Sequence, residues 1–371
     1  SQVREKESVL ILQVKMNASL IIDIAQFVGA LAALIIIHEL GHFTAARLLG
    51  VEVEEFGLGF PPRAVTLFQA GGTRYSLNWL PLGGFVRLKG ENDPDVPGGF
   101  ATANPWTRFA ILSAGPFANL LVGVVLYAMI INRLGAPVPD QVQVIEVVPG
   151  SPAEQAGLLP GDLIMQVNET EIDGTESIHN AIYDNLGETT QITYLRDGQT
   201  ETVVLVPRPD PPEGEGAIGI VMSNPTEPVS VIAALPAGVG AVYQHSETLL
   251  TFPVKIIQGE MEASEGRLLG FKGMFDVYQA VQETEVEQNI PSGVNVLGFF
   301  ATLTISFGIL NLLPIPALDG GRIVFTLPEI ILGRRVPPKY ENAIHLVSLA
   351  LLLMLLLFVN LQDFLNPISL P

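Results

Sequence analysis

The sequence predicts a polytopic α-helical membrane protein with about four transmembrane helices, a membrane-associated β-hairpin and an inserted α+β domain. Its mean hydropathy is +0.41, and 48% of its residues are hydrophobic. Four apolar windows are each close to the ~20 residues that cross the hydrocarbon of a bilayer. These windows are Ser19–Ile37, Ala110–Ile131, Val294–Leu313 and Ile344–Leu361. Another apolar run, Val229–Tyr243, is short and contains proline and glycine, so we expect it to lie on a surface or in a linker.

We divide the chain into six parts, and the distribution of charge predicts which parts face the cytoplasm. Residues 134–293 contain 24 acidic and 5 basic side chains, whereas the rest of the chain contains 14 of each. The short loops on either side carry the arginines, so we expect those loops in the cytoplasm and the acidic block outside. A net charge of −19 also disfavours a nucleic-acid partner. The predicted parts are 16–50 (first transmembrane helix), 51–106 (cytoplasmic-side hairpin loop), 107–133 (second transmembrane helix), 138–208 (α+β domain), 209–292 (linker and amphipathic segments) and 293–371 (third and fourth transmembrane helices).

The first window ends in IIIHELGHFTA, which indicates a metal site. His38 and His42 are four residues apart, so both imidazoles can reach one Zn²⁺ from the same face of a helix. Glu39 points to the neighbouring side, where it can act as a general base without binding the metal. Ionisable groups at membrane depth are costly, which favours a functional reading over a chance match.

A third ligand is expected from NLLPIPALDGGR, which follows the third window. The chain has no cysteine, and its other histidines, His179, His245 and His345, are poorly placed as ligands. Pro314, Pro316 and the paired glycines prevent a regular helix here, and such backbone at membrane depth lines a cavity or is buried in protein. Asp319 is the one acid in this segment. It can serve as a zinc ligand, as the N-cap of the next helix, or as both.

Residues 51–90 predict strands. YSLNWLPLGGFVRLKG places Pro81 and Gly83-Gly84 between two apolar arms, which is a hairpin signal. We expect this hairpin to dip into the membrane beside the zinc, where its edge, at Gly83, Gly84, Phe85 and Val86, could pair with an extended substrate. The alternative is a structural plug that makes no contact with substrate.

The acidic block begins with a small domain. Short strands surround a helix expected at about Thr175–Asn185, and PGSPAEQAGLLPGDLIMQVNE is similar to the signature of PDZ domains. Such a domain either binds extended chains by strand addition or acts as a steric lid, and the sequence leaves both open. The stiff stretch PRPDPPEGEG is expected to end it.

These motifs together resemble the site-2 protease family of intramembrane zinc metalloproteases. HELGH, NLLPIPALDGG and SAGPFANL (Ser113–Leu120), with a PDZ-like block between, are most similar to its bacterial RseP-like branch, although only one PDZ domain is expected here. The resemblance implies that His38, His42 and Asp319 bind zinc and that Glu39 is the general base. It also implies substrate positioning by Asn311, Pro314 and Pro316, and a second-span motif of Gly115, Pro116 and Asn119, of which Asn119 is a further candidate for substrate positioning.

The function expected from the resemblance is a zinc-dependent endopeptidase that cuts transmembrane segments of single-span membrane proteins. Regulated intramembrane proteolysis of this kind would act on an anti-sigma factor or on signal-peptide remnants. The enzyme would lie in a bacterial inner membrane, with its active site toward the cytoplasm and the PDZ domain outside. Two alternatives remain open: a membrane zinc transporter or sensor, and a PDZ scaffold with a vestigial zinc site.

Overall fold

The computed structural model describes residues 2–91, 93, 95–212, 214–260, 267–288 and 290–368, with the side chains of residues 2–18, 60, 61, 80–82 and 338 left out. It divides into two compact units. One unit consists of the chain up to Ile130 and from Leu235 onward, and the other is Ile131–Ala234.

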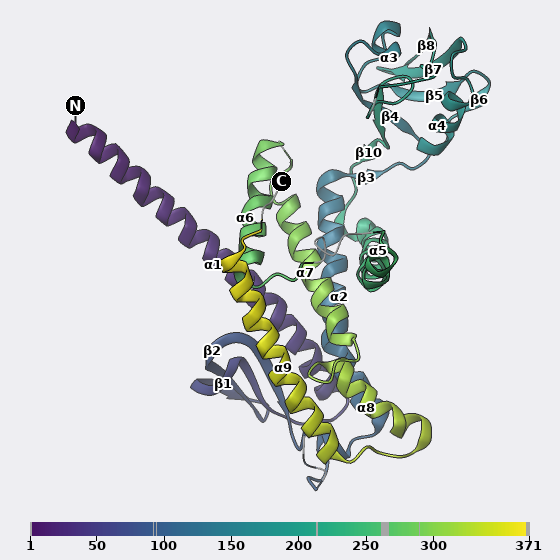
Figure 1. The fold of residues 1–371 in the computed structure, drawn as a ribbon. Coiled ribbons are helices and arrows are strands. Elements are labelled where there is room, and N and C mark those ends of the chain that lie inside the picture. Colours follow the sequence, from purple (N-terminus) through teal and green to yellow (C-terminus); the bar gives the residue numbers. More distant parts are fainter. Residues whose placement is uncertain are drawn as a thin grey trace. The chain divides into compact units, whose positions relative to one another are not determined.

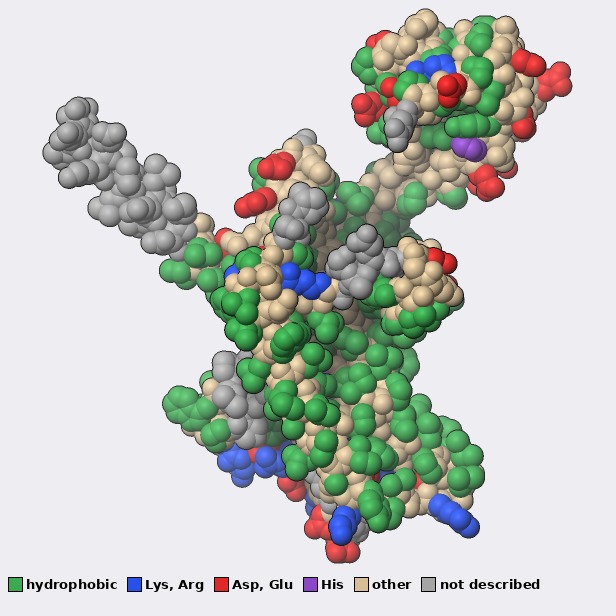
Figure 2. Space-filling model, viewed as in Figure 1, with side chains coloured by type: hydrophobic (Ala, Val, Ile, Leu, Met, Phe, Trp, Pro, Cys, Tyr) green, Lys and Arg blue, Asp and Glu red, His purple; other side chains and the backbone are tan. Residues whose placement is uncertain are grey.

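Helices build the first unit (Figure 1). They are α1 (Gln2–Leu48), α2 (Pro105–Leu134), α5 (Val231–Gln258), α6 (Phe271–Glu287), α7 (Val294–Leu312), α8 (Asp319–Leu332) and α9 (Pro338–Leu365), with a short 3₁₀ helix at Phe100–Thr102. Within the described residues, four helices are long and apolar enough to cross a membrane: Ser19–Leu48, Pro105–Leu134, Val294–Leu312 and Lys339–Leu365. The four predicted windows are therefore confirmed. Figure 2 shows hydrophobic side chains covering most of the visible surface of these helices.

The apolar run predicted to lie on a surface or in a linker forms most of the first half of a continuous helix, α5, and its side chains Ile232, Val239 and Tyr243 are exposed. Its Pro236 is accommodated within the helix. Its Gly238 has a packing role, because an added Cβ atom there would lie only 2.5 Å from the carbonyl oxygen of Val124 on α2. The glycine thus lets the backbones of α2 and α5 touch, and the Tyr127 hydroxyl lies 3.1 Å from Nδ1 of His245 across the same contact. Helix α5 is not among the candidate spans.

Helix α6, predicted only as an amphipathic surface segment, packs into the bundle through aromatic side chains. Phe27 of α1 lies 5.4 Å from Phe275 and 5.5 Å from Tyr278 between ring centroids. Phe299 of α7 joins the same cluster. Because Tyr278 is 2% exposed, this face of α6 belongs to the core rather than to the surface.

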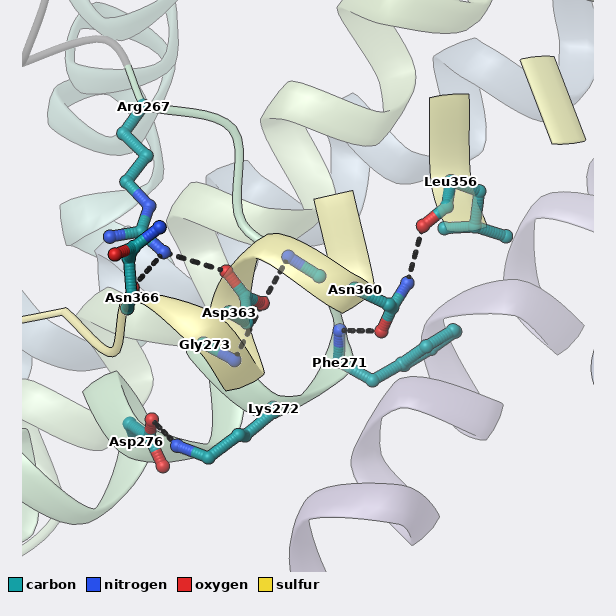
Figure 3. A network of polar contacts seen from close by, with 10 residues as sticks. Arg267, Phe271, Lys272, Gly273, Asp276, Leu356, Asn360, Asp363 and Asn366 are labelled. Atoms are coloured by element: carbon teal, nitrogen blue, oxygen red, sulfur yellow. Dashed lines mark hydrogen bonds and ion pairs between the residues drawn. The ribbon is translucent and has the colours of Figure 1, made fainter. Parts of the chain in front are cut away.

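Carboxylates fix both ends of α6. At its start, Asp363 of α9 accepts hydrogen bonds from the backbone N–H groups of Gly270 (2.7 Å) and Gly273 (2.9 Å), and Asn360 accepts one from Phe271 (Figure 3). At its other end, Glu285 accepts hydrogen bonds from the first N–H groups of α7, including Gly293 at 2.7 Å. Acceptors at helix N-termini satisfy donors that have no partner within the helix. Helix α6 is thus joined to α9 and to α7.

The loop after α1 forms an antiparallel sheet from two long, bent strands, β1 (Val53–Ala70) and β2 (Thr73–Leu88). Their tight turn lies at Gly71-Gly72, not at Pro81. Phe56 in the first half of β1 pairs with both Tyr75 and Val86. The two arms of the predicted hairpin are therefore separated by β1, and the prediction that they pair directly with each other is wrong.

The second unit is a sheet of order β8-β7-β5-β4-β9, with β6 pairing with β5. Its elements are β4 (Val142–Val147), α3 (Pro152–Ala156), β5 (Leu163–Val167), β6 (Thr170–Glu171), α4 (Thr175–Tyr183), β7 (Thr190–Arg196), β8 (Gln199–Leu205) and β9 (Ile220–Ser223). The domain runs past the predicted end at residue 208, because β9 pairs with β4. A further pair, β3 (Ala136–Pro137) with β10 (Thr226–Glu227), brings the entry and exit of the chain together.

The core of this unit is apolar, with Val142, Ile164 and Ile192 each at most 2% exposed. The buried carboxylate of Asp162 is matched by Arg196, whose Nε and one terminal nitrogen each donate to it at 2.7 Å. Such two-point pairing offsets the cost of burying a charge. A hollow between α4 and the β9 segment is lined by apolar side chains, including Ile178, Ile182 and Ile220.

Candidate metal centre and active site

Helices α1 and α2 touch backbone to backbone at the HELGH and SAGP motifs. A Cβ atom added at Gly41 would lie 2.4 Å from the carbonyl oxygen of Ala114, and one added at Gly115 would lie 2.3 Å from Nε2 of His42. Any side chain at either position would separate the helices, because carbon atoms in contact need ~3.5 Å. The two glycines therefore place the His42 ring directly over α2.

Three predicted ligand atoms lie close together. Nε2 of His38 and Nε2 of His42 are 3.2 Å apart, and each is 3.2 Å from Oδ2 of Asp319. The two imidazoles are buried, at 4% and 9% exposure. Among the described residues this is the one group of three such side chains close enough to hold a metal ion. The structure therefore brings together residues that are almost 280 positions apart in the sequence.

The arrangement fits a zinc ion. The centre of a triangle with 3.2 Å sides lies about 1.8 Å from each corner, so the spacing of the three donor atoms is compatible with the ~2.0–2.2 Å of zinc–nitrogen and zinc–oxygen bonds. Oδ2 of Asp319 is buried and makes no hydrogen bond to a described residue. Nδ1 of His42 donates to the Ile111 carbonyl at 2.8 Å, which leaves the lone pair of Nε2 for a metal.

A tight turn presents Asp319. Cβ atoms added at Gly320 and Gly321 would lie 2.1 Å from the Leu313 carbonyl oxygen and 2.3 Å from Cα of Pro316, so only glycine fits. The N-cap of α8 is Leu318, and Asp319 is the first residue of the helix. Of the two roles that the sequence left open for Asp319, the cap is therefore not observed. Burial raises the pKa of Asp319, but the adjacent imidazoles hold it, on balance, below its ordinary value.

The last part of β2 passes beside Glu39. A Cβ atom added at Gly84 would lie 3.0 Å from Cγ of Glu39 and 3.4 Å from Cγ2 of Ile35, so the bare backbone of β2 packs against α1 here. Phe85 covers Gly57 of β1, and Val86 packs on the apolar cluster that joins the sheet to α1 and α2. The predicted placement of this segment beside the HELGH motif is thus found, although the strand pairing differs.

The other residues expected to position substrate lie differently. Asn311 is 6% exposed, and its Nδ2 donates to the Phe307 carbonyl one turn earlier in α7. Asn119 is 0% exposed, with its Cβ near Gly308 of α7, and neither Oδ1 nor Nδ2 of its side chain has a hydrogen-bond partner among the described residues. Pro314 is exposed, and Pro316 lies within the turn before Asp319. Contact of these residues with substrate stays a prediction.

Two contacts around the site were missed from sequence. Nδ1 of His345 on α9 donates to the Pro316 carbonyl at 2.6 Å, and Arg322 pairs with Glu91. His345 had been considered only as a ligand, although a histidine in an otherwise apolar span was a signal that it meets a polar partner. Glu91 pairs with the first turn of α8, which carries Asp319. Burial lowers the pKa of Arg322, but the charge of Glu91 and its hydrogen bond raise that pKa on balance above its ordinary value.

Residues 26–355 match peptidase family M50. The chain belongs to that family. The protein Cj1068 of Campylobacter jejuni, whose name describes a zinc metalloprotease, is 34% identical over 96% of each chain. Metalloprotease MmpA of Caulobacter vibrioides is 28% identical over 92% of this chain and 95% of its own. A PDZ domain of an SdrC-like protein from Listeria monocytogenes has a TM-score of 0.21 and 24% identity, covering 24% of this chain and 92% of that one.

This M50 chain is a membrane protein and a zinc metalloprotease. Its His-His-Asp group is the part of the described structure that can hold the zinc.

Proposed function

We propose that this M50 protease cuts single-span membrane proteins within their transmembrane segments, with Glu39 as the general base. The observation that carries the proposal is the position of the His-His-Asp group at the end of an apolar helix, with Glu39 and the backbone of Gly84 side by side next to it. A protease site at this depth serves substrates whose scissile bond also lies in the membrane.

The chain supplies binding and proton transfer. His38, His42 and Asp319 would hold the zinc, which when bound polarises the scissile carbonyl and acidifies the attacking water. Glu39 accepts a proton from that water and passes it to the leaving amine. The apolar surroundings of α1 exclude bulk water and strengthen these electrostatic interactions.

A helical substrate must unwind before its peptide bond can be attacked, and β2 offers it new partners. The segment Gly83–Leu88 pairs with the first half of β1 on one side, and among the described residues the register gives it no strand partner on the other. An extended substrate segment could add there as a further strand beside Glu39. Its backbone hydrogen bonds would replace part of those lost from the substrate helix.

The cellular setting follows from charge and chemistry. The arginines of the β1–β2 sheet and of the α8–α9 connection support an orientation with the zinc-binding end toward the cytoplasm of a bacterial inner membrane and the acidic PDZ-like unit outside. Substrates of this kind include anti-sigma factor-like proteins and signal-peptide remnants, and their cleavage would be regulated intramembrane proteolysis.

Two other functions are less well supported. A zinc transporter or sensor needs ligands along several spans, whereas in the described residues they gather at one point. A PDZ scaffold with a vestigial site has no need for Glu39 beside that point.

The test uses full-length protein in detergent with a single-span reporter substrate. Glu39→Gln should keep zinc and lose cleavage, because it removes the base and none of the ligands. Asp319→Ala and His38→Ala should lose both, whereas Glu54→Gln, an exposed change on β1, should lose neither. Normal zinc content in Asp319→Ala would remove it as a ligand. Undiminished cleavage by Glu39→Gln would end the proposed mechanism.

A further inference from the structure

Helix α9 makes polar contacts with the bundle near both of its ends. Only 6% of the most apolar window of α9 is made up of buried residues, as in α1, compared with 39% in α2. Side chains along its middle, such as Val347 and Leu351, are exposed at 60% and 57%. Much of the apolar surface of α9 is therefore exposed, and the hydrogen bonds near its two ends contribute to its attachment.

The two polar attachments have different targets. At the end of α9, Asp363 and Asn360 bind the start of α6 (Figure 3). Near its beginning, Nδ1 of His345 lies 2.6 Å from the carbonyl oxygen of Pro316. Because a carbonyl can only accept, Nδ1 must carry the proton and donate it. The first attachment joins two helices, whereas the second reaches the turn that leads into the metal centre.

That turn needs support from outside itself. Proline supplies no N–H group, and Gly320 and Gly321 supply no side chains, so Ile315–Gly321 is held by few contacts of its own. Backbone bonds from Leu318 to Ile315 and from Gly321 to Leu318 close it locally. His345 holds it three residues before Asp319, and the Arg322–Glu91 pair holds it three residues after.

We propose that His345 is a positioning residue for the metal centre. By donating to the Pro316 carbonyl, it fixes the turn so that the Asp319 carboxylate stays 3.2 Å from both imidazoles. The inference rests on Asp319 as the third zinc ligand. It also means that displacement of the beginning of α9 would loosen zinc binding, whereas displacement of its other end would not.

The test measures the affinity for zinc alone, by competition with a chelator, on the full chain in detergent. His345→Ala should weaken zinc binding about tenfold or more, the loss typical of removing a partner that orients a ligand. His345→Asn places an amide N–H near the position of Nδ1 and should restore most of the affinity. Asn360→Ala, at the other attachment of the same helix, is the matched control and should leave zinc affinity unchanged.

Thermal unfolding checks that each variant is folded, and the comparison of zinc affinities then separates positioning of the metal centre from simple attachment of α9. Equal loss of zinc affinity in His345→Ala and Asn360→Ala would show that α9 merely needs to be attached, and the proposal would be wrong. So would wild-type affinity in His345→Ala, or no recovery in His345→Asn. Failure of the ligand assignment can be told apart from failure of this proposal. If Asp319 is not a ligand, Asp319→Ala would keep wild-type zinc affinity, whatever residue stands at position 345.

Discussion

Replacing Gly115 by alanine should damage the metal centre although it replaces none of the three candidate ligands. The new methyl group would lie 2.3 Å from Nε2 of His42, 2.7 Å from its Cε1 and 2.8 Å from its Cδ2. A carbon atom in contact needs ~3.5 Å, so the ring must retreat by about 1 Å. It cannot do so freely, because Nδ1 is bound to the Ile111 carbonyl.

A shift of that size exceeds what a metal site tolerates. Bond lengths to zinc vary by only about 0.2 Å, and sites must be held within ~0.5 Å of their working geometry. We therefore expect Gly115→Ala to lower zinc affinity by ~10–100-fold, the range found for lost support of a ligand, and to lower cleavage in parallel. Chelator competition gives the first value, and initial rates with a single-span reporter give the second.

Gly298→Ala is the matched control, because no atom lies within 4 Å of a Cβ atom added at Gly298, in the second turn of α7. That change should keep zinc binding and stabilise the helix by ~0.5–1 kcal/mol. If Gly115→Ala bound zinc as tightly as Gly298→Ala and cleaved as fast, the close contact between α2 and His42 would not position the ligand, and the reasoning would be refuted.

Three further predictions follow. Gly84→Ala would bring a methyl group to 3.0 Å from Cγ of Glu39, so kcat should fall while zinc affinity stays the same, whereas Gly115→Ala should lower both. Equal loss of zinc affinity in the two variants would contradict this. Hydrogen bonding by Arg63 lowers the pKa of Glu55 in the folded protein. The stability that Glu55 contributes is therefore complete above a pH of ~4.3, its pKa in the unfolded chain, and is lost as the pH falls through the lower folded-state pKa. Thermal unfolding of Glu55→Gln should lack that acid-dependent loss. Pro137 and Thr226 are cross-strand partners, so residues 138–225 can be replaced by a short turn. If the PDZ-like unit is a size filter, this variant should cut substrates with untrimmed outer domains. Cleavage of trimmed substrates alone would favour a ligand-binding role.

The spans and the three candidate metal ligands could be predicted from sequence because their signals are local or chemically restrictive. An apolar window of ~20 residues has few other interpretations, and His38 and His42 lie on one helical turn. Asp319 could be predicted as a ligand by its chemistry, since the chain has no cysteine and zinc needs a third donor. The PDZ-like strands followed from alternation and turn residues.

Strand order and close contacts could not be predicted in the same way. Pro81 and Gly83 gave a valid turn signal, but the partner of each arm is β1, which is decided by pairing between distant segments rather than by the turn. The same holds for β9, which joins the sheet after a proline-rich stretch that suggested an end. Gly238 suggested an interruption, whereas its role is to admit the backbone of α2.

The two histidines at the end of this apolar helix differ in how their buried ring nitrogens are satisfied. His42 is restrained at both ring nitrogens, by the Ile111 carbonyl and by the ligand group. Nδ1 of His38 is buried and has no hydrogen-bond partner among the described residues, so its orientation depends on Nε2 alone. A buried nitrogen without a partner is destabilising in the free protein, and a metal ion at Nε2 would offset that cost. The two imidazoles therefore differ: the fold restrains the His42 ring at Nδ1, whereas the contacts of the His38 ring nitrogens lie at Nε2 alone.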